Sequence, residues 1–283
     1  MSYIKAVANP NFALIKYWGK SDVLSNQPDM SSISITIDSL ESSVKVSFDS
    51  SLQEDHWILN GVDQNSLGQI HPTIEYLRSF KRIKDHCIID SENNFPTAAG
   101  LASSASGIAS IVVAIVKLFE LKLTNEQLIY AAMLGSGSAP RSLFSGFVHL
   151  NKLDNYSCQT ILKPSHWPLK VIICLTSAKE KIISSRKGMM ISKLTSPYYD
   201  SWVKDQEADI SLALKAIEKR NFGLLGKVVE KNCEKMHKVM ETSKPPLIYR
   251  NQTTNPPRIA PKLLPLPPTI TITQIKNVYL IGL

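Results

Sequence analysis

Residues 96–107 read PTAAGLASSASG, a run of small residues that leads directly into an apolar helix. Large apolar residues then recur at helical spacing, at Ile108, Ile111, Val112, Ile115 and Leu118. Small residues at a loop-to-helix junction let backbone N–H groups approach an anion, and the helix N-terminus adds a partial positive charge. The run therefore predicts a phosphate site at the start of a buried helix. The alternative is tight helix packing that requires small residues, since neither common glycine-rich phosphate motif is present.

Strands and helices are expected on both sides of this run. Alternation or short apolar runs predict strands at 34–37, 44–48, 56–62, 87–90, 146–150 and 169–176. Helical spacing predicts helices at 72–80, 124–134, 199–219 and 222–240. Thr124 and Gln127 form a capping box at the start of one helix, and Asn60 with Gly61 favours a hairpin turn. The last helix carries an apolar stripe that predicts core packing, made of Leu225, Val229, Cys233, Met236 and Met240.

The segment after Tyr249 differs in composition from the rest of the chain. Half of the 16 prolines fall between Pro245 and Pro268, and no Asp or Glu occurs after Glu241. Proline removes a backbone donor and fixes φ, so we expect this run to be extended or disordered. Two short stretches, 270–273 and 278–281, are expected to pair locally as strands.

The overall composition is that of a globular protein in a reducing compartment. Apolar residues make up 43% and charged residues 20% of 283 residues, which excludes a disordered or collagen-like chain. The four cysteines are scattered, which excludes a disulfide framework and a zinc ribbon. The first residues lack the apolar stretch of a secretory signal, and no apolar run is long enough to cross a bilayer. We therefore expect a cytoplasmic protein with no membrane partner.

The net charge of +8 favours an anionic partner. Its distribution argues against nucleic acid, because five basic residues and no acidic residue lie between Thr242 and Leu283. The rest of the chain is only mildly basic, and it lacks the basic and aromatic interleaving of a single-strand binder. Small phosphorylated ligands are the better expectation. The six histidines are dispersed without metal-ligand spacing, so no side-chain metal cluster is predicted.

Three further segments combine hydroxyls or aromatic residues with cations that suit anions. Residues 135–142 read GSGSAPRS, residues 184–188 read SSRKG, and residues 11–20 read NFALIKYWGK. A guanidinium with neighbouring hydroxyls can bind a carboxylate or a phosphate. Taken singly, each segment has an ordinary alternative: a loop with a surface arginine, a solvated turn, or a solvated lysine face. Together with residues 96–107 they predict one site that collects several negative charges.

The same segments resemble those of the diphosphomevalonate decarboxylases, a family within the GHMP kinase superfamily. The resemblance runs from about Asn9 to Tyr249 and is most specific in IKYWGK at 15–20 and NFPTAAGLASSA at 94–105. It implies an α+β fold of two lobes, one like domain 2 of ribosomal protein S5 and one ferredoxin-like, with the site between them. It also implies phosphorylation of the tertiary hydroxyl of mevalonate 5-diphosphate by ATP with Mg²⁺. Loss of phosphate and CO₂ then yields isopentenyl diphosphate.

The resemblance also implies a role for each matching residue. Asn11 and Lys16 should lie near the reacting hydroxyl, and Arg141 should bind the substrate carboxylate. The ATP phosphates should be held by Pro96, Ala99, Gly100, Ser103, Ser104 and Ser106, with Ser104 also touching the magnesium ion. The remainder of the phosphorylated substrate should be bound by Tyr17, Lys20, Ser136, Ser138, Ser185 and Arg186.

The division into domains and the departures from the family follow from the same comparison. We expect an S5-like lobe at 1–165, an incomplete ferredoxin-like lobe at 166–249, and an atypical proline-rich tail at 250–283. Family members carry a C-terminal Asp-Ala-Gly-Pro-Asn segment that is absent here, so activity is expected to be impaired. We hypothesise a shift of reading frame between 250 and 255. Met30 also stands where an asparagine is common in the family, which predicts an altered substrate preference.

Two other functions remain open from the sequence. The first is a mevalonate-type kinase that phosphorylates without decarboxylating, and the second is a non-catalytic protein that binds a nucleotide or a diphosphate. Mevalonate monophosphate is not distinguished from the diphosphate as a substrate. The family resemblance implies a homodimer.

Overall fold

The computed structural model describes residues 2–96, 103–175, 183–250, 270–273 and 278–282. The strands are β1 (Ile4–Ala8), β2 (Asn11–Ile15), β3 (Ser32–Thr36), β4 (Ser42–Phe48), β5 (His56–Leu59), β6 (Val62–Gln64), β7 (Cys87–Asn93), β8 (Phe147–Asn151), β9 (Ser157–Leu162), β10 (Val171–Leu175), β11 (Ile270–Thr273) and β12 (Val278–Gly282). The α-helices are α1 (His71–Ser79), α2 (Ser103–Leu118), α3 (Asn125–Gly135), α4 (Ser185–Thr195), α5 (Tyr199–Glu218) and α6 (Phe222–Glu241). Short 3-10 turns are η1 (Gly68–Ile70), η2 (Ala139–Ser142) and η3 (Pro164–His166). The α+β class expected from the sequence is confirmed.

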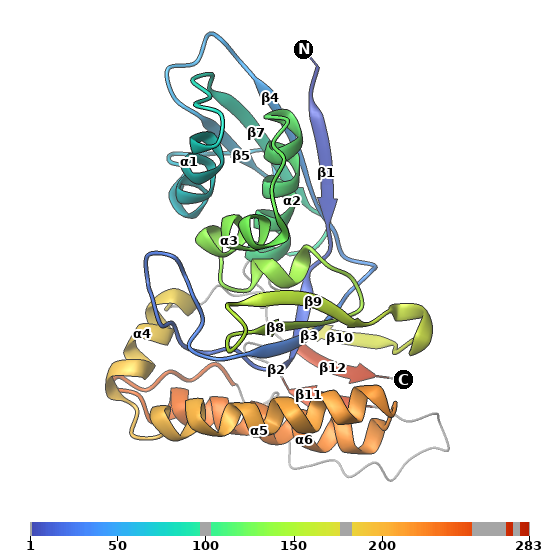
Figure 1. Ribbon diagram of the computed structural model, residues 1–283. Helices are drawn as coiled ribbons and strands as arrows, with labels where there is room; N and C mark the ends of the chain where they lie inside the picture. The colour runs from blue at the N-terminus through green and yellow to red at the C-terminus, as the bar shows by residue number, and fades with distance from the viewer. Residues whose placement is uncertain (1, 97–102, 176–182, 251–269, 274–277, 283) are drawn as a thin grey trace.

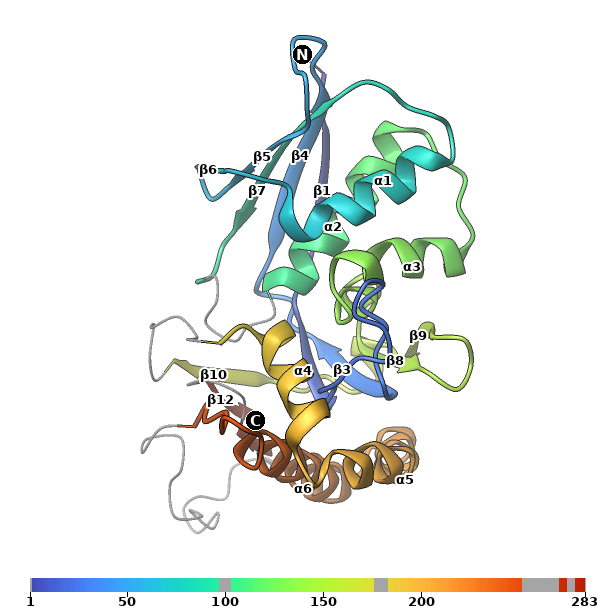
Figure 2. The same cartoon turned by 90° about the vertical axis from the view of Figure 1, so that its left-hand side faces the viewer.

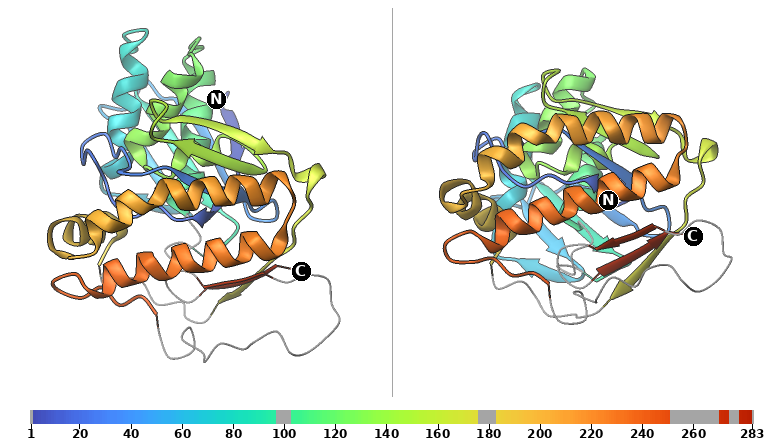
Figure 3. Two further views of the ribbon diagram at one scale, coloured as in Figure 1. Left: turned by 60° about the horizontal axis from the view of Figure 1, so that its bottom comes forward. Right: turned by 90° about the horizontal axis from the view of Figure 1, so that it is seen from below.

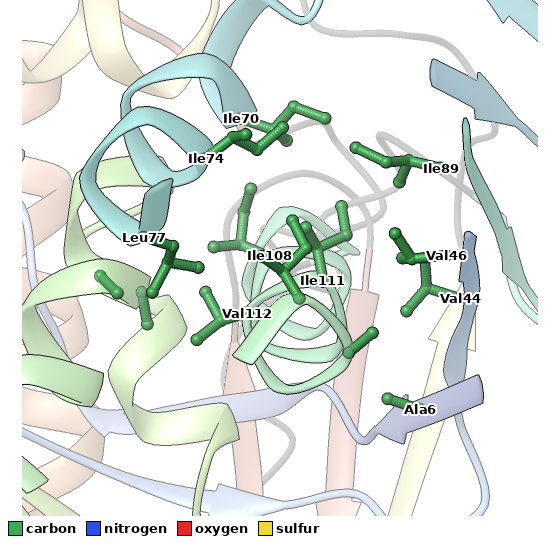
Figure 4. Close-up of a cluster of buried hydrophobic side chains, with 14 of the residues drawn as sticks. Ala6, Val44, Val46, Ile70, Ile74, Leu77, Ile89, Ile108, Ile111 and Val112 are labelled. Carbon is green, nitrogen blue, oxygen red and sulfur yellow. The ribbon is translucent and has the colours of Figure 1, made fainter. Parts of the chain in front are cut away.

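One half of the molecule is a five-stranded sheet with α1, α2 and α3 on one face (Figures 1 and 2). The strand order is β1-β4-β7-β5-β6, antiparallel except for the parallel pair β5 and β7. The apolar face of α2 lies at the centre of this core, where Ile108, Ile111 and Val112 meet Val46 and Ile89 of the sheet (Figure 4). The buried helix expected behind the small-residue run is thus confirmed, and it begins at Ser103.

The other half is a four-stranded sheet covered by two long antiparallel helices (Figure 3). The order is β2-β3-β8-β9, and α5 and α6 pack on it through a second core. Phe12 and Ile33 of the sheet contact a layer that includes Ile210 of α5 and Val229 of α6. The predicted stripe on α6 is buried along its whole length. Site residues on β2 are therefore supported by the packing of this sheet on α5 and α6.

A third sheet joins distant parts of the chain in the order β10-β12-β11. β12 pairs antiparallel with both β10 and β11, so both stretches expected to pair locally do so. The sequence did not predict the pairing of β12 with β10, which lies about a hundred residues earlier in the chain. β11 lies against α6 (Figure 3).

Local signals in the sequence agree with the structure at several places. Thr124 and Gln127 form both hydrogen bonds of the capping box, and Asn60 and Gly61 adopt φ of 51° and 74° in the turn between β5 and β6. The strands β1, β2 and β9 and the helix α4 were not predicted. Among the described residues, no helix has the length and apolar character needed to cross a bilayer.

Candidate active site

The segment after β2 carries Lys16 into the interior, where two amide side chains hold its backbone. The Lys16 N–H donates to Asn232 Oδ1 at 2.8 Å, and the Lys16 carbonyl accepts from Gln206 Nε2 at 2.7 Å. Asn232 Nδ2 in turn donates to Gln206 Oε1 at 3.0 Å and to Asp209 Oδ2 at 2.9 Å. Lys235 pairs with the same Asp209 oxygen at 2.9 Å. This network from α5 and α6 fixes the backbone position of Lys16.

The Lys16 ammonium is buried and has one hydrogen-bond acceptor among the described residues, the Ala13 carbonyl at 2.7 Å. It also lies 4.3 Å from the centre of the Phe12 ring. Burial lowers the pKa of Lys16 to about 8, and the nearby Arg141 guanidinium contributes to the lowering. Lys16 is therefore a poorly solvated cation whose charge an anionic ligand would stabilise.

Arg141 lies in η2 and is 2% exposed. Its Nη1 donates to Ser32 Oγ at 2.5 Å and its Nε donates to Asn11 Oδ1 at 3.2 Å. Asn11 is oriented for this role because its Nδ2 donates to Ser142 Oγ at 2.7 Å and to the Ser138 carbonyl at 3.2 Å. Burial lowers the pKa of Arg141 to about 10, which leaves it charged at neutral pH. Among the described residues the guanidinium is held by neutral acceptors alone, which leave its positive charge unneutralised.

Two further cations, Lys20 and Arg186, share one hydrogen-bond acceptor, the side chain of Asn26 in the loop between β2 and β3. Arg186 Nη2 donates to Asn26 Oδ1 at 2.7 Å, and Lys20 Nζ donates to the same oxygen. Burial lowers the pKa of Lys20 to about 8, with a further contribution from Arg186. Arg186 comes from the first turn of α4, whose N-cap is Ser184, and Ser185 is the first residue of that helix. The SSRKG segment is therefore a helix start rather than a solvated turn.

The loop before η2 lies against Tyr17 and against the backbone of Asn26. A Cβ on Gly137 would lie 2.6 Å from the Tyr17 hydroxyl and 2.6 Å from the Asn26 carbonyl, so the absence of a side chain permits this contact. The flanking Ser136 and Ser138 hydroxyls lie 3.1 Å apart. Burial raises the pKa of Tyr17, which remains a neutral hydroxyl donor. Contacts among residues 11–20, 135–142 and 184–188 therefore bring together three of the four segments from which the sequence predicted a single site.

The predicted phosphate run is described only in part. Ala99 and Gly100 lie outside the described residues, whereas Pro96 is exposed and Ser103 and Ser104 open α2. The Ser106 hydroxyl is buried and lies 2.6 Å from Ser42 Oγ of β4.

A cavity of about 110 Å³ adjoins this helix start. Ser103 and Ser104 line it together with Trp57 of β5 and Asn93 of β7. The Trp57 indole is fixed by a hydrogen bond of 2.9 Å from Nε1 to Ser91 Oγ. A mainly apolar cavity with a few hydroxyl and amide groups in its lining suits a planar heterocyclic base.

The sequence did not identify three residues that organise the site. Gln206 and Asn232 lie 190 and 216 residues from Lys16, and no local pattern marks them. Asn26 has a weak signal, since asparagine is one of the few residues that tolerate its φ of 58°. The described residues contain no cluster of three or more His, Cys, Asp or Glu side chains able to hold a metal ion.

Comparisons with known proteins agree with this geometry. A family model described as the diphosphomevalonate decarboxylase-like N-terminal domain matches residues 8–160. A second, for the mevalonate 5-diphosphate decarboxylase C-terminal domain, matches residues 171–256.

Individual proteins similar to this chain carry the same names as the two family models. A diphosphomevalonate decarboxylase of Ganoderma lucidum is 34% identical over an alignment of 279 positions that covers 90% of this chain and 70% of the relative. That of Saccharomyces cerevisiae is 34% identical, over 89% of this chain and 69% of the relative. A solved structure of MDDEF in complex with MVAPP, AMPPCP and magnesium has a TM-score of 0.88 at 32% identity, covering 100% of this chain and 89% of that chain. Mevalonate diphosphate decarboxylase from Staphylococcus aureus has a TM-score of 0.88 at 32% identity, covering 99% and 87%.

Proposed function

The chain belongs to the diphosphomevalonate decarboxylase family, and we propose that it converts mevalonate 5-diphosphate and ATP into isopentenyl diphosphate, ADP, phosphate and CO₂. The main support is a set of cations without counter-ions. In the described part of the chain, no carboxylate lies within 4.0 Å of Lys16, Lys20, Arg141 or Arg186. The first three are buried, and a buried charge without a partner is costly. A substrate with a diphosphate and a carboxylate would supply the missing negative charge.

The two groups of cations suit the two ends of such a substrate. Lys20 and Arg186, beside the Tyr17 hydroxyl, would bind the diphosphate. Arg141 would bind the carboxylate, because its planar guanidinium is held rigidly by Asn11 and keeps its full charge. Ser136, Ser138 and Ser185 would add hydroxyl donors around the same ligand.

The nucleotide would occupy the start of α2. Its base fits the cavity beside Trp57, and its phosphates would then reach Ser103, Ser104 and the preceding loop. A similar solved structure contains AMPPCP and magnesium, which supports this arrangement. Magnesium prefers oxygen ligands and binds proteins through few side chains together with phosphates, so the exposed Ser104 hydroxyl fits as one ligand. When bound, the ion would neutralise phosphate charge during transfer.

Catalysis in this scheme consists mainly of positioning and charge stabilisation. Asn11 and Lys16 would lie at the tertiary hydroxyl, with Lys16 stabilising the phosphoryl group as it is transferred. Arg141 would then hold the carboxylate in place while the 3-phosphate leaves with its electron pair and the C–C bond to the carboxylate breaks. The electrons of that bond form the new double bond, and CO₂ is released.

Turnover with mevalonate 5-diphosphate and ATP tests this proposal when ADP and CO₂ are both measured. Equal release of both products supports the decarboxylase. Release of ADP without CO₂ would instead identify a kinase. Binding of ATP or substrate by calorimetry without release of ADP would identify a non-catalytic binding protein, and the same experiment with mevalonate monophosphate defines the substrate.

The segment after Tyr249 bears on the level of activity. We propose that residues 242–283, which contain no Asp or Glu and no Asp-Ala-Gly-Pro-Asn run, do not supply the carboxylate that the family resemblance implies near the substrate hydroxyl. Full turnover would then require a carboxylate from another segment. The C-terminal family model ends at residue 256, close to the hypothesised shift of reading frame. Sequencing the encoding DNA tests this hypothesis, which is wrong if no alternative frame downstream encodes the missing run.

We further propose two lobes, 1–165 and 166–249, followed by the tail 250–283. A homodimer in the cytoplasm completes the proposal. The cysteines Cys87, Cys158 and Cys233 are buried and form no disulfide among the described residues, which suits a reducing compartment. Sedimentation equilibrium measures the oligomeric state, and a monomer at micromolar concentration would contradict the dimer.

A further inference from the structure

Asn26 is a fully buried side chain that joins three separate segments of the chain. Its Nδ2 donates to the Leu134 carbonyl near the end of α3 at 2.6 Å. Its Oδ1 accepts from Arg186 Nη2 of α4 at 2.7 Å and from Lys20 Nζ. The amide therefore has a defined orientation, because its donor and acceptor ends face different elements.

The loop that carries Asn26 is itself held in place. The Asp22 carboxylate accepts from the backbone N–H groups of Leu24 at 3.1 Å and Ser25 at 3.0 Å. The Ser21 N–H donates to the Gln27 carbonyl at 2.9 Å, which closes the loop around Asn26. Hydrogen bonds within the loop therefore fix the backbone around Asn26.

The chemistry of the bridge is unusual because one neutral oxygen serves two cations. A carboxylate at this place would form two ion pairs and cancel the charge of both. The amide oxygen holds the cations in register, and each keeps its positive charge for another partner. The neighbouring carboxylate of Asp29 is engaged elsewhere, with Lys193 Nζ and the Tyr199 hydroxyl, both at 2.7 Å. Lys20 and Arg186 are therefore aligned, and no carboxylate in the described segments neutralises either of them.

We propose that Asn26 is a positioning residue that holds Lys20 and Arg186 as a two-cation receptor for a diphosphate group. The assignment rests on the proposed function for the identity of the natural substrate. The receptor itself follows from the three hydrogen bonds and from the absence of a carboxylate partner for either cation among the described residues. Its neutrality matters as much as its geometry, since a charged side chain of the same shape would compete with the ligand.

Calorimetric titration with inorganic pyrophosphate tests the receptor without requiring turnover. Asn26→Asp keeps the shape but adds a negative charge between the cations, and we expect at least a tenfold rise in the dissociation constant. Asn26→Leu removes the bridge without adding charge, and we expect a smaller rise of about threefold. Asn221→Asp, which exchanges two good N-cap residues at the start of α6, is the matched control and should bind as the unchanged protein does.

A second measurement separates this role from a loss of fold. Affinity for AMPPCP should stay within about twofold in both Asn26 variants, because the nucleotide would bind at α2 rather than at this loop. Equal pyrophosphate affinity of Asn26→Asp and the unchanged protein, or no pyrophosphate binding by the unchanged protein, would overturn the inference.

Turnover distinguishes the two proposals from each other. Pyrophosphate binding that depends on Asn26, with neither ADP nor CO₂ released from mevalonate 5-diphosphate, supports the receptor and contradicts the proposed reaction. Normal turnover with an unchanged KM for mevalonate 5-diphosphate in Asn26→Asp contradicts the receptor and leaves the reaction intact.

Discussion

Replacement of Asn232 by leucine tests the network that fixes the backbone of Lys16. The change keeps the branched shape of the side chain, with two larger methyl groups, and removes its amide. The Lys16 N–H and Gln206 Oε1 then lose their partners in the interior, whereas Asp209 keeps its ion pair with Lys235 at 2.9 Å. Each buried polar group left unsatisfied costs about 1–3 kcal/mol, so the free energy of unfolding should fall by about 2–6 kcal/mol.

Urea unfolding followed by circular dichroism measures this loss, with Asn221→Ala as the control on the same helix. Asn221 is the N-cap of α6 and accepts from the Leu224 N–H at 2.9 Å, so its removal should cost about 1 kcal/mol. The two asparagines thus differ in burial while sharing a residue type and a helix. If Asn232→Leu destabilises the protein no more than Asn221→Ala, at an unchanged dependence on urea, the network does not support Lys16 as described.

Three further predictions follow from single side chains. Arg141→Ala should lower the release of ADP and CO₂ by about 10²-fold or more, since it removes an anion-stabilising group, and unchanged turnover would reject the role of Arg141. Burial lowers the pKa of His237 to about 3, so below pH 6.5 the unfolded chain takes up a proton that the native state does not. Stability should therefore fall as the pH decreases from about 6.5 towards 3, by up to about tenfold in the unfolding constant per pH unit, and urea titrations should show a flatter profile for His237→Leu. Gly137→Ala would place a Cβ 2.6 Å from the Tyr17 hydroxyl, so steady-state kinetics should show a KM for mevalonate 5-diphosphate raised about tenfold or more, as a misplaced binding group causes. Gly226→Ala meets no atom within 4 Å and should leave this KM unchanged.

The sequence predicted those elements whose pattern is strong and local. The apolar spacing of α2, the capping box of α3 and the stripe on α6 each depend on residues a few positions apart. β2 escaped prediction because its sequence NFALI is buried on both faces and shows no alternation between polar and apolar residues. α4 was missed because a short sequence with serine and glycine resembles a turn, although Ser184 is a good N-cap.

The residues of the candidate site likewise fall into those that the sequence could predict and those that it could not. The cations and hydroxyls could be identified because they cluster in short segments and match a family pattern. The amides that orient them could not, because Asn26 contacts Arg186 across 160 residues and Asn232 contacts Lys16 across 216 residues. Hydrogen bonds between residues so far apart in the sequence depend on how the two halves of the chain pack. Local sequence patterns do not predict that packing.

The distribution of ion pairs argues that the unpaired cations serve a function. Elsewhere in the described residues, two partly buried cations have carboxylate partners: Arg78 pairs with Asp55 at 2.6 Å and Lys235 pairs with Asp209 at 2.9 Å. By contrast, the side-chain acceptors that the described residues provide for Lys20 and Arg141 are amides and a hydroxyl. Because a buried cation is stabilised far better by a carboxylate than by a neutral acceptor, this choice sacrifices stability. The loss is recovered only when a polyanion binds, so ligands with a diphosphate should raise the thermal midpoint more than ligands with a single phosphate.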